Sequence, residues 1–161
     1  INVYASKGTF SKLNLVGHRF KIIKALQQFE IGNFIILPFD TQHDAREPLG
    51  FLIQYKPTGE KLLYATDTYY IKYKFRKLNY LLIECNYNKN FAKENATNGI
   101  INKTRYSRLL ESHFSLENVL KFLQANDLTY TKNIILCHLS NENANQEIMK
   151  NAVFNQTRNT N

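Results

Sequence analysis

Short runs of apolar residues alternate with polar segments along most of the chain, a pattern typical of strands in a sheet. Six runs predict strands: Ile1–Ala5, Phe34–Leu37, Leu49–Tyr55, Lys61–Ala65, Tyr80–Ile83 and Asn133–Cys137. The dipeptide Gly32-Asn33 before the second run is a hairpin signal, and the segment 57–59 (Pro-Thr-Gly) predicts a turn. We therefore expect hairpins between the early strands.

The apolar period changes to that of a helix between the last two predicted strands. Apolar residues from Leu116 to Leu123 recur at the spacing of one helical face, and Ser115 stands before them as a natural N-cap. Further helices are predicted over residues 102–111 and 144–153. Strand and helix therefore alternate in the second part of the chain.

The order of the predicted elements indicates the fold class. Hairpin-linked strands come first and strand–helix alternation follows, which predicts an α/β domain (α+β by some schemes) with a mixed sheet covered by helices. The 161 residues suit one domain. We expect it to span residues 1–154, with 155–161 as a flexible C-terminal tail. A strand at residue 1, with no lead-in, suggests that the chain begins in mid-domain.

Charge and cysteine content narrow the setting. Lys and Arg number 21 against 13 Asp and Glu, and the net charge of +8 favours a polyanionic partner or a phosphate-bearing substrate. No apolar run approaches the roughly 18 residues of a membrane span, so no membrane partner is expected. Cys85 and Cys137 form no disulfide framework; we interpret them as reduced packing residues, in keeping with a cytoplasmic location.

One cluster of basic residues is interleaved with aromatics. Lys72, Lys74, Arg76 and Lys77 alternate with tyrosine and phenylalanine between residues 69 and 77. Such a pattern can bind phosphates while the rings stack on bases. The simpler interpretation is a solvated face of a Lys-rich protein.

Residues that can bind a metal follow the ends of predicted strands. His43, Asp67 and His138 each come just after an apolar strand, whereas His113 is expected to open a helix and His18 to be structural. Adjacent strands deliver their end residues to one edge of a sheet, and imidazole with carboxylate suits Zn²⁺. The joint pattern suggests a metal site, although a lone histidine is more commonly a capping or hydrogen-bonded residue.

Five segments, in this order and spacing, resemble the second half of a metallo-β-lactamase-fold hydrolase. They are Pro38–Phe51, Tyr64–Thr68, Leu82–Asn86, Ser112–Glu117 and Leu136–Ser140. Within that superfamily, the pair Glu84 and His113 points to the phosphodiesterase branch, which includes tRNase Z-like enzymes, YycJ-like proteins and phage anti-Pycsar cyclic-nucleotide phosphodiesterases. The resemblance implies the second half of an αββα sandwich, in a bacterial cell or one infected by phage.

The resemblance also implies a role for each of five residues. His43 would complete the first metal's ligand set, Asp67 would bridge both metals, and His138 would bind the second. The metals would be zinc, with manganese as the alternative, about 3.5–4 Å apart. His113, oriented by Glu84, would protonate the leaving oxygen as a general acid. The implied activity is hydrolysis of a cyclic nucleotide or of an RNA or DNA phosphodiester, with a homodimer as the assembly.

One departure from the family pattern is large. The H-x-H-x-D-H motif, which supplies two ligands to each metal, does not occur in this sequence. The segment Val3–Thr9 resembles the stretch just after that motif, so we expect the chain to be the C-terminal part of a longer protein, with an incomplete domain over residues 1–154. The remaining ligands predict weak metal affinity, an inactive isolated chain and uncovered apolar faces.

Two other functions remain open at this point. A non-catalytic module of the same fold could bind nucleic acid or a protein through its basic, aromatic-rich surface. Alternatively, a half-domain could pair with another chain that carries the missing half. For Glu84 and His113, the plain alternatives are a charged strand end and a helix-cap histidine.

Overall fold

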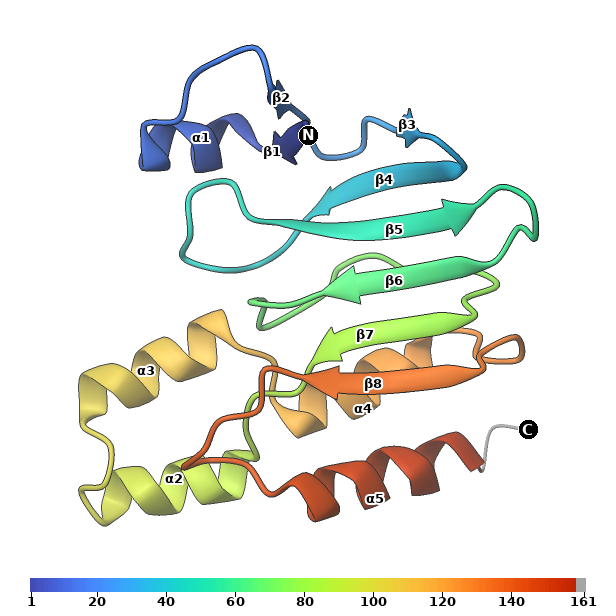
Figure 1. Ribbon diagram of the computed structural model, residues 1–161. Coiled ribbons are helices and arrows are strands. Elements are labelled where there is room, and N and C mark those ends of the chain that lie inside the picture. The colour runs from blue at the N-terminus through green and yellow to red at the C-terminus, as the bar shows by residue number, and fades with distance from the viewer. Residues whose placement is uncertain (159–161) are drawn as a thin grey trace.

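The centre of the fold is a six-stranded mixed sheet (Figure 1). The computed structural model describes residues 1–158. The strands, in spatial as well as chain order, are β3 (Phe29–Ile31), β4 (Phe34–Asp40), β5 (Leu49–Tyr55), β6 (Lys61–Ala65), β7 (Tyr80–Glu84) and β8 (Asn133–Cys137). Pairing is antiparallel from β3 to β6 and parallel from β6 to β8. As a result, β4, β6, β7 and β8 all point toward one edge of the sheet.

The predicted strands agree closely with those observed. Strands β5, β6 and β8 have the predicted bounds, while β4 extends to Asp40 and β7 to Glu84. The hairpin signal is confirmed, since Ile31 pairs with Phe34 around Gly32-Asn33. Gly32 has a φ of 55°, which suits the tight turn of a two-residue hairpin.

A small separate unit precedes the sheet. Strand β1 (Val3–Ala5) pairs in parallel with β2 (Phe20–Ile22), and α1 (Lys7–Leu13) connects the two. The predicted first strand therefore exists but does not join the main sheet. Helix α1 carries no long apolar stripe, which explains why the hydrophobic pattern did not predict it.

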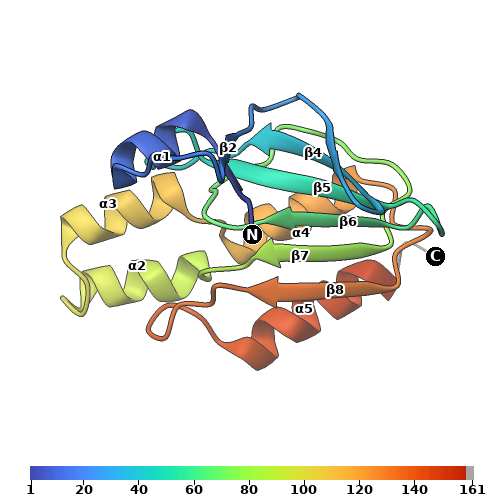
Figure 2. The ribbon, with the colours of Figure 1, turned by 45° about the horizontal axis from the view of Figure 1, so that its top comes forward.

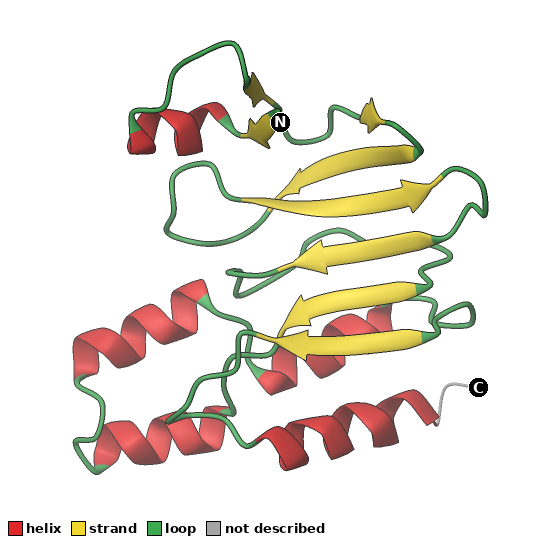
Figure 3. Ribbon diagram, viewed as in Figure 1, coloured by secondary structure: helices red, strands yellow, loops and turns green. Residues whose placement is uncertain are grey.

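Four further helices follow the antiparallel strands. They are α2 (Lys89–Thr97), α3 (Lys103–Ser112), α4 (Leu116–Ala125) and α5 (Gln146–Arg158). The predicted N-cap is confirmed, because Ser115 Oγ accepts a hydrogen bond from Asn118 N at 3.2 Å. Helices α2 and α3 lie beyond the arrowheads of β6–β8, whereas α4 and α5 run alongside the sheet (Figure 3). None of the helices within residues 1–158 has the length and hydropathy needed to cross a membrane.

The expected tail needs correction. Helix α5 continues through Arg158, so residues 155–158 are helical, and only 159–161 lie outside the described residues. Met149 and Val153 bury the inner face of this helix. Because packing anchors the helix there, its last turn, residues 155–158, can be polar.

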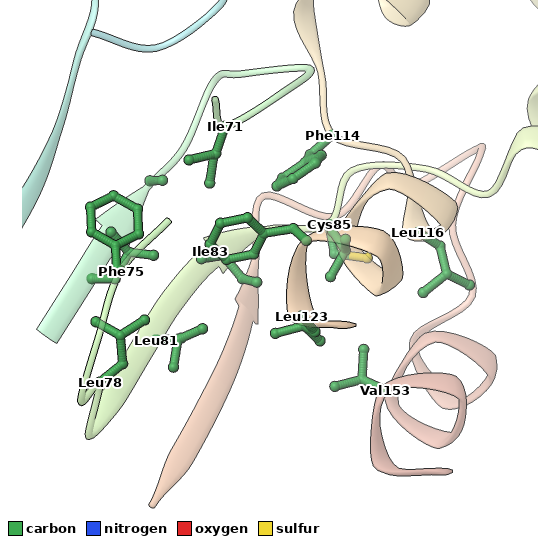
Figure 4. Packing of buried hydrophobic residues seen from close by; sticks show 14 of the residues in the cluster. Ile71, Phe75, Leu78, Leu81, Ile83, Cys85, Phe114, Leu116, Leu123 and Val153 are labelled. Carbon is green, nitrogen blue, oxygen red and sulfur yellow. The ribbon is translucent and has the colours of Figure 1, made fainter. Parts of the chain in front are cut away.

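The core lies between one face of the sheet and helices α4 and α5. Leu81 and Ile83 of β7 are fully buried and pack with Leu123 of α4 and Val153 of α5 (Figure 4). Burying one such side chain contributes about 1.5–3 kcal/mol. This packing fixes the parallel strands, and so fixes the positions of the residues at their ends.

The opposite face of the sheet is apolar as well. Tyr64, Leu82 and Ile135 stand in register across β6, β7 and β8, and Ile135 keeps 50% of its surface exposed. Figure 2 shows α4 behind the sheet, on the side away from the viewer, and α5 beside β8. The expected exposure of apolar surface is therefore present in the described residues.

Candidate metal centre

The strand ends bring the candidate residues to one edge of the sheet. Asp67 comes two residues after β6, Glu84 is the last residue of β7, and His138 directly follows β8. His43 comes three residues after β4, which points in the same direction. His113 lies in the break between α3 and α4. All five sequence-predicted residues therefore converge, although they span residues 43 to 138.

The position of His113 differs from expectation. It is the C-cap of α3, and its backbone N–H bonds Leu109 O at 3.1 Å, so it ends a helix rather than opening one. Helix α4 begins only after Ser115. The short break between the helices turns the imidazole toward the sheet edge, which a continuous helix would not do.

A buried carboxylate holds two of the imidazoles. Glu84 has no exposed surface, and its Oε1 lies 2.6 Å from His113 Nδ1 and 2.8 Å from His138 Nδ1. Its Oε2 accepts hydrogen bonds from the backbone N–H groups of Thr68, at 2.9 Å, and Phe114, at 3.4 Å. A buried carboxylate is tolerated only with such partners. The hydrogen bond to Glu84 is the main cause of the raised pKa of His113, which burial opposes.

Asp67 stands at the centre of the histidines. Its Oδ1 lies 3.5 Å from His138 Nδ1, 3.9 Å from His43 Nε2 and 4.0 Å from His113 Nδ1. The rings themselves are neighbours, with centroids 5.5 Å apart for His43 and His113 and 5.2 Å apart for His113 and His138. One carboxylate oxygen therefore faces three imidazoles.

These distances suit a metal ion. Two atoms that bind one zinc ion lie at most about 4.2 Å apart, because each sits about 2.1 Å from it. Asp67 Oδ1 meets this limit with His43, His113 and His138. Ligand atoms of Asp67, Glu84, His113 and His138 also lie within 4.8 Å of one another. The donor set therefore fits a divalent cation.

The set is smaller than a complete catalytic site. With Asp67 shared, each of two ions would have one imidazole and one carboxylate oxygen, whereas catalytic zinc usually has three protein ligands. His138 Nδ1 also shares a proton with Glu84. Binding an ion at that nitrogen would release the proton, as metal binding to histidine generally does.

Two of the candidate ligands have strained backbones. Asp67 and His138 adopt φ values of 53° and 57°, in the left-handed region that non-glycine residues rarely occupy. Such a conformation costs on the order of 1–3 kcal/mol and persists where the surroundings hold it. Asn86 holds the second turn, since its Nδ2 donates to His138 O at 2.7 Å. The strain turns both side chains out of their strands toward the site.

Two clefts flank the centre, one on each side of α3. One has a volume of about 760 Å³ and includes His43 and Tyr69 in its lining; the other, of about 510 Å³, includes His113 and His138. Arg108 borders both. A third hollow of about 770 Å³, between β8 and α5, has none of the candidate ligands in its lining.

Sequence reasoning missed the residues that support the site. Arg108 Nε lies 2.8 Å from Asp44 Oδ2, and this hydrogen bond is the main reason that the pKa of Asp44 is lowered. The pair ties α3 to the loop that carries His43. Asn86, which holds the His138 turn, was also missed. No signal in the sequence links Asp44 to Arg108, because they are 64 positions apart and belong to different elements.

Structural comparison decides the fold. The sequence matches no family model and no curated protein. The metallo-β-lactamase fold protein YhfI from Bacillus subtilis superposes with a TM-score of 0.65 at 13% identity, over 95% of this chain and 58% of that one. The chain has a metallo-β-lactamase fold. Its mixed sheet and helices match this neighbour, as the sequence resemblance predicted.

Two further structures show how varied proteins of similar structure are. CmlA, a diiron β-hydroxylase from Streptomyces venezuelae, has a TM-score of 0.61 at 12% identity, over 98% of this chain and 37% of that one. The short form of human tRNase Z has a TM-score of 0.52 at 13% identity, over 88% and 61%. The chain thus spans between 37% and 61% of the lengths of these three proteins. Identities this low show the fold and leave the reaction to the site itself.

Proposed function

We propose that this chain supplies part of the active site of a metal-dependent hydrolase that cleaves phosphodiester bonds, in a cyclic nucleotide or in RNA or DNA. The observation that carries the proposal is the position of Asp67, whose Oδ1 lies within 4.0 Å of nitrogens of three histidines. The presence of tRNase Z among proteins of similar structure supports it. A net charge of +8 favours a phosphate-bearing substrate.

The proposed ligand roles are those that the sequence resemblance implies, and two distances support them. His43 and Asp67 would hold one divalent cation, and His138 and Asp67 the second, with zinc or manganese as the metal. When bound, two such cations clamp a phosphodiester and make hydroxide available near neutral pH. Asp67 belongs to both ligand pairs through one oxygen. Its loss would therefore weaken binding of both cations.

The role of general acid falls to His113. Glu84 Oε1 accepts the proton of His113 Nδ1 at 2.6 Å, which fixes the ring and leaves Nε2 to deliver a proton to the leaving oxygen. The same oxygen also contacts His138 Nδ1, and an ion bound at that nitrogen would replace this hydrogen bond.

The test needs a complete ligand set. This chain, joined to an upstream segment that carries H-x-H-x-D-H, should hydrolyse cyclic nucleotides or RNA ends in the presence of zinc or manganese. Asp67→Ala should abolish turnover, while Asp127→Ala, which removes an exposed carboxylate in the loop after α4, should leave it unchanged. Turnover that survives Asp67→Ala, or no turnover on any phosphodiester, would contradict the proposal.

A further inference from the structure

The connection between β6 and β7 converts the basic cluster of the sequence into a row. From Ile71 to Phe75 the backbone makes no turn, and Ile71 and Phe75 are buried while Lys72, Lys74 and Arg76 are exposed. Alternate side chains of an extended segment point to opposite faces. Lys72 and Lys74 alternate with the buried residues along this segment, and Arg76 follows at a bend; these three exposed cations are named here the basic strip.

Helix α4 holds the segment in place at two points. Asn118 Nδ2 donates to Tyr69 O at 3.2 Å, and Asn126 Oδ1 accepts from Phe75 N at 2.8 Å. Ile71 and Phe75 also belong to the hydrophobic core. The strip is thus formed before any partner arrives, which lowers the entropy lost on binding.

The outer part of the strip has uncompensated charge. Lys72 is paired with Asp40. Within residues 1–158, by contrast, Lys74 and Arg76 make no ion pair with a carboxylate. Two unpaired cations two residues apart, on a backbone that is held in place, present positive charge to an extended anion.

The inner end of the strip leads to the candidate metal centre. Tyr69 lies two residues after Asp67, lines the cleft that includes His43, and donates its backbone N–H to Gln42 O at 3.0 Å. Tyr69 and Tyr70 keep 38% and 52% of their surfaces exposed. Aromatic rings beside a line of cations are what single-stranded nucleic acid binds, since unpaired bases stack on the rings while phosphates meet the charges.

We propose that the basic strip, with Tyr69 and Tyr70, binds single-stranded nucleic acid and leads it to the metal centre. The strip uses phosphates and base faces, which RNA and DNA share, so both should bind. The path to the metal centre rests on the proposed hydrolase function. The binding itself requires neither metal nor turnover.

The experiment measures binding without metal. Fluorescence anisotropy of the 161-residue chain with fluorescein-labelled rU20 and dT20, in EDTA and over a series of salt concentrations, gives affinity and salt dependence. Lys74→Ala combined with Arg76→Ala should weaken binding about tenfold and reduce the slope of log affinity against log salt by about 1.4, at about 0.7 per phosphate contact. Tyr70→Leu should weaken binding at least about fivefold with the slope unchanged.

The matched control removes the same charge elsewhere. Lys93→Ala combined with Lys150→Ala changes exposed residues of α2 and α5, and should change affinity less than twofold. Circular dichroism melts establish that every variant is folded. The proposal would be overturned by any of three results: equal effects from the two double substitutions, tighter binding of a duplex than of the single strands, or no binding at low salt. None of these outcomes bears on metal-dependent hydrolysis of a cyclic nucleotide, which is measured separately.

Discussion

The parallel end of the sheet and the small N-terminal unit use similar residues in different ways. In β7, Leu81 and Ile83 are fully buried against helices, and Glu84 follows them into the site. In the N-terminal unit, residues 1–26, Phe10 and Ile23 are buried, but Val16 is 88% exposed and Leu26 60% exposed. Apolar residues alone therefore do not make a core. In the sheet, neighbouring strands and covering helices fix the point at which each strand ends. The residues that follow those ends are therefore held in defined positions and can form a site.

Substitutions on the two sides of this comparison should differ most in stability. Leu81→Ala should lower the free energy of unfolding by about 2–5 kcal/mol, because it opens a cavity in the packed core. Val16→Ala, in the N-terminal unit, should change it by less than about 0.5 kcal/mol. Urea denaturation followed by circular dichroism measures both. If Leu81→Ala itself does not fold, Ile83→Val should still cost about 0.5–1.5 kcal/mol. Equal costs at Leu81 and Val16 would show that the core does not lie where we place it.

Removing the buried anion should have the next largest effect. Glu84→Gln should destabilise the metal-free protein by about 1–3 kcal/mol, because two imidazoles and two backbone N–H groups lose a carboxylate acceptor. Glu94→Gln, an exposed position of α2, is the control for a lost carboxylate. Denaturant midpoints in EDTA would give the difference, and a cost no greater than the control would argue against Glu84 as the anchor of the site.

The contact between Glu84 and His113 predicts that stability depends on pH. The pKa of His113 is raised in the folded protein above its ordinary 6.5, chiefly by Glu84. Its contribution to stability should therefore be complete below pH 6.5 and disappear as the pH rises through the folded-state pKa. Unfolding midpoints from pH 5.5 to 9 should show this loss in the wild type and not in His113→Gln. A loss that persists in that variant would assign it to another group.

Metal affinity should separate the ligands from their surroundings. Asp67→Ala should weaken zinc binding about 10–100-fold, since it removes the oxygen that faces three imidazoles. His18→Ala, in the N-terminal unit, should leave the affinity unchanged. Competition with a chromophoric chelator at pH 7.5 measures each constant. Equal affinities for the two variants would exclude Asp67 as a ligand.

The smallest change is expected for the cysteines. Burial raises the pKa of Cys85 to about 12 and that of Cys137 to about 11. Neither thiol should react appreciably with a disulfide reagent in the folded protein at pH 8, whereas Val16→Cys, in the N-terminal unit, should react at once. Reaction in guanidinium should reveal both native thiols. Rapid labelling of Cys85 in the native protein would mean that the parallel end opens readily.

Much of the site could be predicted from the sequence, for a definable reason. His43, Asp67 and His138 were predicted because strand ends are readable from apolar runs and strand direction from topology. The break between the helices was predicted as well, from the helix over 102–111 and the Ser115 cap, but His113 was expected to open the second helix and instead ends the first. The sequence did not predict the roles of Arg108, Asp44 and Asn86, because their partners are remote in sequence. The homodimer and the cytoplasmic location stay predictions.

The sequence by itself determined the order of the strands, the residues at which they end and the polar residues that follow them. These depend on local patterns of two to ten residues, which apolar period and turn chemistry make legible. Only the tertiary structure decided which oxygen faces which nitrogen. Asp67 meets three histidines, and Glu84 holds two of them, because parallel pairing of β6, β7 and β8 sets their ends side by side. That pairing is a long-range consequence of the core beneath it, and no local stretch of the chain encodes it.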